Sequence, residues 1–297
     1  MSFNEGSSLD TSQVTGGGRG GAVIGGGIGG VVILLIGLFF GVDLSSINPS
    51  GSPFDTSQVS TSGTGETYDL SHCKTGADAN QYDDCRIVGT VNSVQDYWKD
   101  ALPADLSRQY RAAQTVIYSG STQSACGTAS NQTGPFYCPT DERVYIDASF
   151  FEILSRDYGA DSGALAQEYV VAHEYGHHVE HILGLLDNQD GQTGASSNGV
   201  RIELMADCLA GVWANHASTT QDADGNTLLK PLSEADIQSA LSAASAVGDD
   251  RIQQSSGGTV NPDSWTHGSS EQRQQWFMTG YEGGTINQCN TFDTDAL

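Results

Sequence analysis

The chain has 297 residues, of which 37% are hydrophobic and 16% charged, and 37 are glycine. This length allows one well-buried domain with additional segments, and the glycine content points to sizeable low-complexity stretches. The net charge of −24, with only 12 lysines and arginines, argues against nucleic-acid binding, which depends on clustered cations.

The N-terminal part predicts a membrane anchor. Residues 1–21 are polar and rich in glycine, and residues 22–42 then carry no charge, which is long enough for a single transmembrane helix. Arg19 before this stretch and Asp43 after it predict a cytoplasmic N-terminus, with the rest of the chain outside the cytoplasm at the cell membrane. The alternative is a cleaved signal peptide, but a basic start and a small-residue cleavage site are both missing.

The folded domain is expected to span residues 72–297, after a flexible linker over residues 43–71 that is rich in Ser, Thr, Gly and Pro. None of the six cysteines forms a CxxC pair, so a zinc ribbon is not expected. An even number in an exported domain indicates disulfides. We expect sequential pairing, which closes two short local loops: Cys73–Cys85, Cys126–Cys138 and Cys208–Cys289.

The periodicity within this domain is mostly helical, with a small sheet. Helices are expected over 87–98, ending before Pro103, around 150–159, from about 162 to 184, around 199–217, over 233–248 and over 270–279. Short strands are expected over 115–119 and 143–147. The fold class is therefore α+β and mainly helical.

The stretch HEYGHHVEH, from His173 to His181, contains two overlapping zinc-peptidase motifs. H-E-x-x-H runs from His173 to His177, and the inverted H-x-x-E-H runs from His177 to His181. At about 100° per residue, His173 and His177 lie in the middle of the apolar face of the helix. His181 lies nearer the rim and in the last turn, so helix geometry favours the forward motif.

A third ligand is available only to the forward motif. Catalytic zinc commonly takes two histidines and one carboxylate, and leaves a position for water. Glu203 lies on the next predicted helix, in RIELMADCLAG, with Asp207 four residues later on the same face. Alanines on this face, and Gly176 on the first helix, would let the two helices pack closely. Asp207 could then accept the free N–H of a ligand histidine.

The other polar side chains of the histidine stretch are not assigned to the metal. His178 points away from the metal face and is expected to be solvated, as is His181. Glu180 lies close to the metal face, where it would serve as an acceptor for a ligand or as an ion-pair partner.

The segments HEYGHHVEHILG, RIELMADCLAGVWANHA and THGSSEQRQQWFMTGYEGG, together with the opening FNEGSSLDTSQV, resemble the bacterial predicted neutral zinc metallopeptidases, a membrane-anchored family. HExxH followed by ExxxD also resembles the gluzincin arrangement, which implies a zincin-like domain. By this resemblance His173, His177 and Glu203 hold one Zn²⁺ per chain. Glu174 is then the catalytic residue and Asp207 supports a ligand.

The mechanism implied is hydrolysis of a peptide bond by a zinc-activated water, with Glu174 as the general base. His267 and Tyr281 are candidates for stabilising the oxyanion, and His267 could instead cap the helix that follows it. The strand over 143–147 could be an edge strand on which an extended peptide lies.

The sequence thus predicts a membrane-anchored zinc endopeptidase that acts on peptides or proteins. Two alternatives remain: a non-catalytic extracytoplasmic scaffold or binding protein stabilised by zinc, and a peptidase that uses the inverted motif. The intact Glu174 disfavours the scaffold, because a purely structural metal site has no use for that carboxylate. Substrate specificity and oligomeric state stay open.

Overall fold

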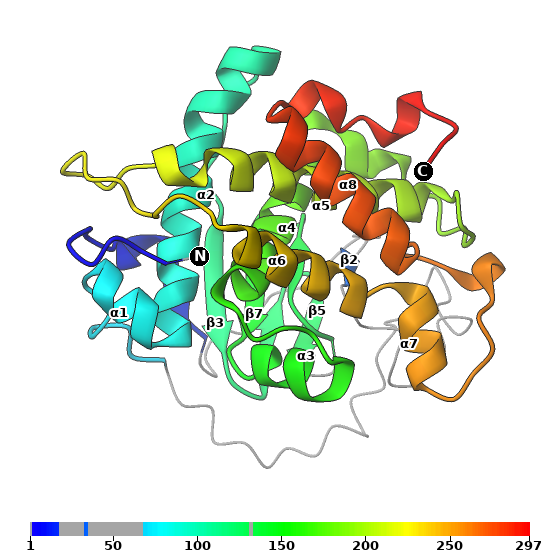
Figure 1. The fold of residues 1–297 in the computed structure, drawn as a ribbon, viewed down its shortest axis with the longest axis horizontal. Coiled ribbons are helices and arrows are strands. Elements are labelled where there is room, and N and C mark those ends of the chain that lie inside the picture. Colours follow the sequence, from blue (N-terminus) through cyan, green and yellow to red (C-terminus); the bar gives the residue numbers. More distant parts are fainter. Residues whose placement is uncertain (1, 18–32, 35–67, 131–132) are drawn as a thin grey trace.

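The computed structural model describes residues 2–17, 33–34, 68–130 and 133–297 (Figure 1). Their strands are β1 Val14–Gly16, β2 Ile33–Leu34, β3 Gln114–Tyr118, β4 Ser121–Ser124, β5 Gly127–Ser130, β6 Phe136–Cys138 and β7 Arg143–Asp147. Their α-helices are α1 Gly76–Gln81, α2 Asp83–Leu106, α3 Phe150–Tyr158, α4 Ala164–Leu183, α5 Asn198–His216, α6 Glu234–Ala246, α7 Asp249–Ser255 and α8 Ser270–Gly283. The fold is therefore mixed helix and sheet.

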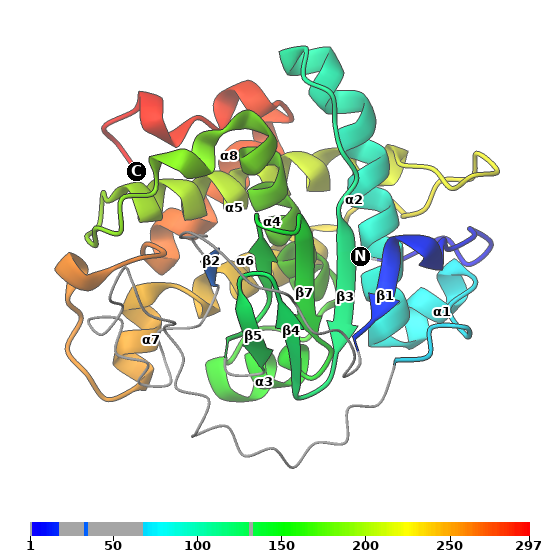
Figure 2. The ribbon, with the colours of Figure 1, turned by 180° about the vertical axis from the view of Figure 1, so that it is seen from behind.

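The main sheet has five strands in the order β1-β3-β7-β6-β2. β3 pairs in parallel with both β1 and β7, while β6 pairs antiparallel with β7 and with β2. Seen from behind, the strands lie in front of the helices, and the β4–β5 hairpin forms a separate two-stranded ribbon (Figure 2). The strand over 143–147 was expected at an edge, but β7 lies between β3 and β6. That expectation was wrong, and both sides of β7 are already paired.

Helices α4, α5, α6 and α8 pack together in the layer seen in front in Figure 1. Small residues let their backbones approach closely. A Cβ added at Gly176 of α4 would lie 2.9 Å from the Ala206 backbone of α5. A Cβ at Gly280 of α8 would lie 1.9 Å from the Cys208 carbonyl oxygen of α5. The expected close contact between the two motif helices is therefore present.

The ends of these helices follow their capping residues. Ser233 caps α6 by accepting a hydrogen bond from the Asp236 amide, and α4 ends at Gly184, whose φ of 75° suits glycine. One end was predicted wrongly: α2 was expected to stop before Pro103 but continues to Leu106. Pro103 has no N–H to donate to the carbonyl four residues earlier, so α2 loses one hydrogen bond there and still continues for one further turn.

The N-terminal residues are part of this domain rather than a separate segment. Phe3 is fully buried, and its ring packs so closely on Gly89 that a Cβ on this glycine would overlap it. Asn80 binds the Phe3 backbone on both sides, accepting from its amide at 2.8 Å and donating to its carbonyl at 3.0 Å. Val14–Gly16 then adds β1 to the sheet beside β3. Residues 3–16 therefore contribute to both the core and the sheet.

The predicted transmembrane helix over residues 22–42 is not supported. Most of that range, and nearly all of the predicted linker, lies outside the described residues. Within 22–42 the structure describes only Ile33 and Leu34, and these two residues form strand β2 rather than a helix. Within the described part of the chain, none of the helices combines the length and apolarity that a membrane crossing needs.

The predicted single-pass localisation is also wrong, because it places the N-terminus and the domain on opposite sides of a membrane. Gly16 and Tyr68 lie so close that a Cβ on Gly16 would meet the Tyr68 carbonyl oxygen at 2.4 Å. Residues 3–16 pack on the same body as residues 72–297, so both lie on one side. Charge counting at Arg19 and Asp43 could not reveal this contact between distant segments.

The three disulfides are those expected from the sequence: Cys73–Cys85, Cys126–Cys138 and Cys208–Cys289. The last joins the middle of α5 to the segment after α8. Disulfides of this number are typical of proteins in oxidising compartments.

Candidate metal centre

Two helices bring the three predicted ligands together. His173 and His177 lie one turn apart on α4, and Glu203 faces them from α5. One ligand atom from each residue lies within 4.8 Å of the others, and all three residues are buried. Glu203 Oε2 is 3.2 Å from His173 Nε2, and Glu203 Oε1 is 3.6 Å from His177 Nε2. The two imidazoles and the carboxylate thus converge on one point.

A carboxyl group lies within hydrogen-bond distance of Nδ1 of each ligand histidine, on the side of the ring away from Glu203. Asp207 Oδ1 is 2.8 Å from His173 Nδ1, and Glu180 Oε2 is 2.7 Å from His177 Nδ1. Each ring is therefore oriented with Nδ1 toward a carboxyl group and Nε2 toward Glu203, and this orientation leaves Nε2 as the nitrogen that would bind a metal. The side chain of Glu180, which had no definite task in the sequence, therefore orients His177.

Asp207 is in turn held by two groups that the motif does not contain. Arg273 of α8 donates from Nε to Oδ2 at 2.8 Å and from Nη2 to Oδ1 at 2.9 Å, and Tyr169 of α4 donates its hydroxyl to Oδ1. The sequence did carry one signal for Arg273. It shares a helical face with Trp276, Phe277 and Gly280, and an arginine on an apolar stripe usually has a buried partner.

Burial and these charges set the protonation of the metal-free centre. Burial alone would lower the pKa of His173, but the Asp207 and Glu203 carboxylates together outweigh it and raise that pKa to about 9. Burial lowers the pKa of His177 to about 3. Burial would raise the pKa of Glu203, yet the surrounding histidines hold it below its ordinary value. At neutral pH the metal-free centre thus pairs the Glu203 carboxylate with a protonated His173, and a metal ion bound at His173 Nε2 would displace that proton.

The centre fits a zinc ion by its unsatisfied atoms as well as by its ligand types. His177 Nε2 is buried and has no hydrogen-bond partner in the part of the chain that the structure describes. A buried polar atom without a partner is destabilising, and a cation bound between Nε2 and Glu203 would satisfy it. Two imidazoles and one carboxylate form a common catalytic zinc set, and hydrogen-bonded carboxylates behind the rings are typical of such sites.

Glu174, next to His173 on α4, is the most poorly satisfied side chain of the site. It is fully buried, and among the described residues neither carboxyl oxygen has a hydrogen-bond partner of normal geometry. Burial raises its pKa to about 8, and the nearby Tyr137 backbone amide of β6 lowers it slightly without completing such a bond. Both carboxyl oxygens of Glu174 are therefore available to a ligand, since none of the described groups forms a hydrogen bond with them.

His267 reaches the same group from the loop before α8. It is buried, and its Nε2 lies 3.9 Å from Glu203 Oε1. Asp249 fixes the loop, because its Oδ2 accepts the backbone amides of Thr266, His267 and Gly268 at 2.7 to 3.0 Å. Burial opposes protonation of His267, but the Glu203 carboxylate raises its pKa. The structure thus brings His267 to the predicted ligands.

Other predicted residues lie elsewhere. Tyr281 stacks on Phe277 and packs where α8 crosses Gly211, away from the histidine pair. His178 was expected to be solvated but is buried, with Nδ1 2.9 Å from the Tyr137 hydroxyl and Nε2 2.6 Å from the Arg111 carbonyl oxygen. Helical phase puts His178 on the face of α4 opposite the His173–His177 pair, and that face is covered by the sheet rather than by solvent. His181 is partly exposed and lies 3.4 Å from Glu142.

Comparison with known families gives a match over nearly the whole chain. The model of a family described as "Putative neutral zinc metallopeptidase" matches residues 4–292, nearly the whole chain. The match includes the N-terminal residues that pack on the domain.

Two groups of relatives align with most of the length of this chain. The "Uncharacterized protein Mb2605" of Mycobacterium bovis and the "Uncharacterized protein Rv2575" of Mycobacterium tuberculosis are each 49% identical over 302 residues, covering 100% of both chains. The "Uncharacterized protein YpfJ" of Escherichia coli is 38% identical over 282 residues, covering 93% of this chain and 87% of its own. No solved structure matches the chain.

Proposed function

The chain belongs to this family of neutral zinc metallopeptidases, and from that membership we propose that it is a zinc-dependent endopeptidase. His173, His177 and Glu203 would hold one zinc ion, with Asp207 and Glu180 orienting the two histidines. Zinc held by three protein side chains keeps an open position and supplies Lewis acidity toward water and a carbonyl oxygen. The other contributions come from side chains of the protein.

The observation that carries the proposal is the Glu174 carboxyl. It is buried beside the ligand group, and within residues 2–17, 33–34, 68–130 and 133–297 both of its oxygens lack hydrogen-bond partners. Keeping such a group buried destabilises the fold, and a structural metal site would gain nothing from it. A general base, in contrast, needs free acceptor oxygens and a pKa near the working pH.

Glu174 would accept a proton from the attacking water molecule and pass it to the leaving amine, so that its own charge is restored at the end of the cycle. His267 would donate a hydrogen bond to the oxygen of the substrate carbonyl as negative charge develops there. Its loop is fixed through Asp249, so this donor is oriented before the substrate binds. The substrates would be peptides or unfolded segments of proteins.

A scaffold that binds zinc without catalysis is the second candidate, and the same experiment separates the two. The full chain would be loaded with zinc, its zinc content measured, and cleavage of a mixed peptide library followed by mass spectrometry. The variant Glu174→Gln should retain zinc while cleavage falls by about 10²- to 10⁴-fold, the usual contribution of a general base.

Glu168→Gln is the matched control, since Glu168 is another fully buried glutamate of the same helix. It should cleave at the wild-type rate. Zinc binding with no cleavage by the wild type would favour the scaffold. Full activity of Glu174→Gln would refute the assignment of Glu174 as the base.

A further inference from the structure

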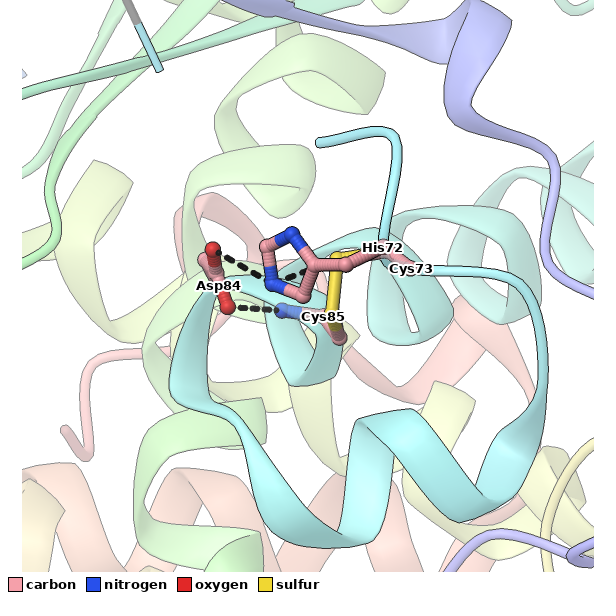
Figure 3. Close-up of side chains that lie close together, drawn as sticks. All are labelled: His72, Cys73, Asp84 and Cys85. Atoms are coloured by element: carbon pink, nitrogen blue, oxygen red, sulfur yellow. Dashed lines mark hydrogen bonds and ion pairs between the residues drawn. A yellow bond between two sulfur atoms is a disulfide. The ribbon is translucent and has the colours of Figure 1, made fainter. Parts of the chain in front are cut away.

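A second cluster of potential metal ligands lies far along the chain from the histidine pair, at the start of α2. It contains His72, Cys73, Asp84 and Cys85, and one ligand atom from each lies within 4.8 Å of the others. Asp84 and Cys85 stand in the first turn of α2, and His72 and Cys73 precede α1. Figure 3 shows the imidazole beside the disulfide, with the Asp84 carboxylate on its other side.

The hydrogen bonds of His72 fix which nitrogen faces the cluster. Its Nδ1 is 3.0 Å from the Asp69 carbonyl oxygen, which can only accept, so Nδ1 carries the proton. Its Nε2 lies 3.2 Å from Asp84 Oδ2 and 3.6 Å from Cys73 Sγ. When the ring is neutral, the Nε2 lone pair therefore points between a carboxylate oxygen and a sulfur atom, as a metal ligand would.

Asp84 is oriented as firmly as His72. Its Oδ1 accepts the backbone amide of Cys85 at 2.9 Å, which leaves Oδ2 facing the ring (Figure 3). Cys85 lies near the N-terminus of a 24-residue helix, and a helix N-terminus stabilises a thiolate. One nitrogen, one carboxylate oxygen and two thiolates are ligands that zinc binds in a tetrahedral arrangement.

In the disulfide form the two sulfur atoms are bonded to each other, so this set is incomplete as a metal site. We propose that reduction of Cys73–Cys85 converts the cluster into a site for one zinc-type divalent cation, ligated by His72, Cys73, Asp84 and Cys85. The two cysteines have Cα atoms 5.0 Å apart, so both thiolates can reach a common ion after a change of side-chain rotamer.

The conversion is balanced as a two-electron reduction followed by cation binding. A thiol reductant breaks the S–S bond and becomes its own disulfide, and its two protons end on Cys73 and Cys85. The cation then displaces those two protons from the sulfur atoms. The same two segments are thus joined by a covalent bond under oxidising conditions and by a metal under reducing conditions.

The site would matter because of what these segments support. Directly after Cys73, the Gly76 amide donates to the Ser7 carbonyl at 2.9 Å, and Asn80 of α1 binds the Phe3 backbone. Residues 3–8 therefore attach to the loop that the Cys73–Cys85 pair closes. A metal in the reduced protein would keep this attachment formed before the disulfide is made.

Co²⁺ gives a direct test, because a thiolate bound to Co²⁺ produces a charge-transfer band in the near ultraviolet. The full-length protein would be reduced with a phosphine and titrated with Co²⁺, and its bound Co²⁺ counted. The His173, His177 and Glu203 centre contains only nitrogen and oxygen ligands, so it gives no such band. The result is therefore independent of the proposed peptidase function.

We expect the reduced wild type to show the band and to bind one Co²⁺ more than the oxidised protein. Cys73→Ser/Cys85→Ser, which leaves the other four cysteines in place, should lose both the band and that extra ion. His72→Ala/Asp84→Asn retains all six cysteines and should bind the extra Co²⁺ at least about tenfold more weakly. Removing a group that only orients a ligand already lowers metal affinity by about tenfold or more, and removing the ligands themselves should lower it at least as much.

Asp83→Asn is the charge-matched control, because Asp83 is an exposed neighbour paired with Arg86, and it should behave as the wild type. Two outcomes would overturn the proposal. One is a reduced wild type without the band. The other is a band of equal strength and affinity in the wild type and in either double variant.

Discussion

Arg273 forms a two-point ion pair with Asp207 beneath the histidine pair, and both side chains are fully buried. The guanidinium compensates the carboxylate, and the carboxylate in turn orients His173. The centre therefore depends on a residue of α8, about 100 positions after the first ligand.

Replacing Arg273 with Gln should destabilise the protein by about 3 to 5 kcal/mol, because the buried Asp207 carboxylate loses the guanidinium that pairs with it at two points. Urea unfolding of the zinc-free protein would measure this. Arg273→Lys retains the charge but loses the planar fork, so its destabilisation should be smaller but still measurable. Unchanged stability of Arg273→Gln would contradict the role described for the pair.

Asp207→Asn and Glu180→Gln should each weaken zinc binding by about 10- to 100-fold, since each removes the acceptor that orients one ligand histidine. Competition with a chromogenic chelator would give the affinities. The effect should be similar in the two variants, because the two histidine–carboxylate distances are similar, at 2.8 and 2.7 Å. A loss in only one variant would show that the two histidines do not share this support.

His178 should make the stability of the protein sensitive to acid. Burial lowers its pKa to about 4 from the ordinary 6.5. Between these two values the histidine binds a proton in the unfolded chain but not in the folded protein. Stability attributable to this residue is therefore intact above pH 6.5. It falls by up to about 1.4 kcal/mol per pH unit as the pH drops toward 4.

The variant His178→Gln isolates this contribution, because Gln can still donate to the Arg111 carbonyl and accept from the Tyr137 hydroxyl. Urea unfolding of the zinc-free proteins between about pH 7 and pH 5 should give a shallower decline for the variant. Parallel curves would show that His178 does not titrate on unfolding.

Gly280→Ala should destabilise the protein by about 1 to 3 kcal/mol, because the added Cβ would overlap the Cys208 carbonyl oxygen and force α5 and α8 apart. Thermal unfolding would measure the loss. Gly6→Ala provides a contrast, since nothing lies within 4 Å of the added Cβ and its φ is not in the left-handed region. Equal losses would mean that helix contact is not what requires Gly280.

The histidine helix and its partner were predictable because their signals are local. The spacing of His173 and His177, the four-residue step from Glu203 to Asp207 and the small residues at Gly176 and Ala206 all follow from helical periodicity. The disulfides were predictable because Cys73–Cys85 and Cys126–Cys138 close short loops.

What the sequence did not reveal depends on contacts between distant segments. β1 pairs with β3 about 100 residues later, and nothing in Val14–Gly16 specifies that partner. Apolar composition over 22–42 predicted a helix without reference to the sheet that Ile33 and Leu34 join. The phase of Glu180 was ambiguous because a long side chain near the rim can turn toward His177 or away from it.

The contact of Gly16 with Tyr68 has a consequence for proteolysis. All six cysteines lie after Tyr68, so no disulfide joins residues 2–17 to the rest of the protein. A single cut between residues 18 and 67 would therefore yield two polypeptides held together by noncovalent contacts, among them the burial of Phe3, the Asn80 hydrogen bonds and the pairing of β1 with β3. Such a nicked protein would migrate as one species in gel filtration and as two fragments in denaturing electrophoresis. The N-terminal fragment, prepared separately, would be a peptide ligand able to complement the remainder.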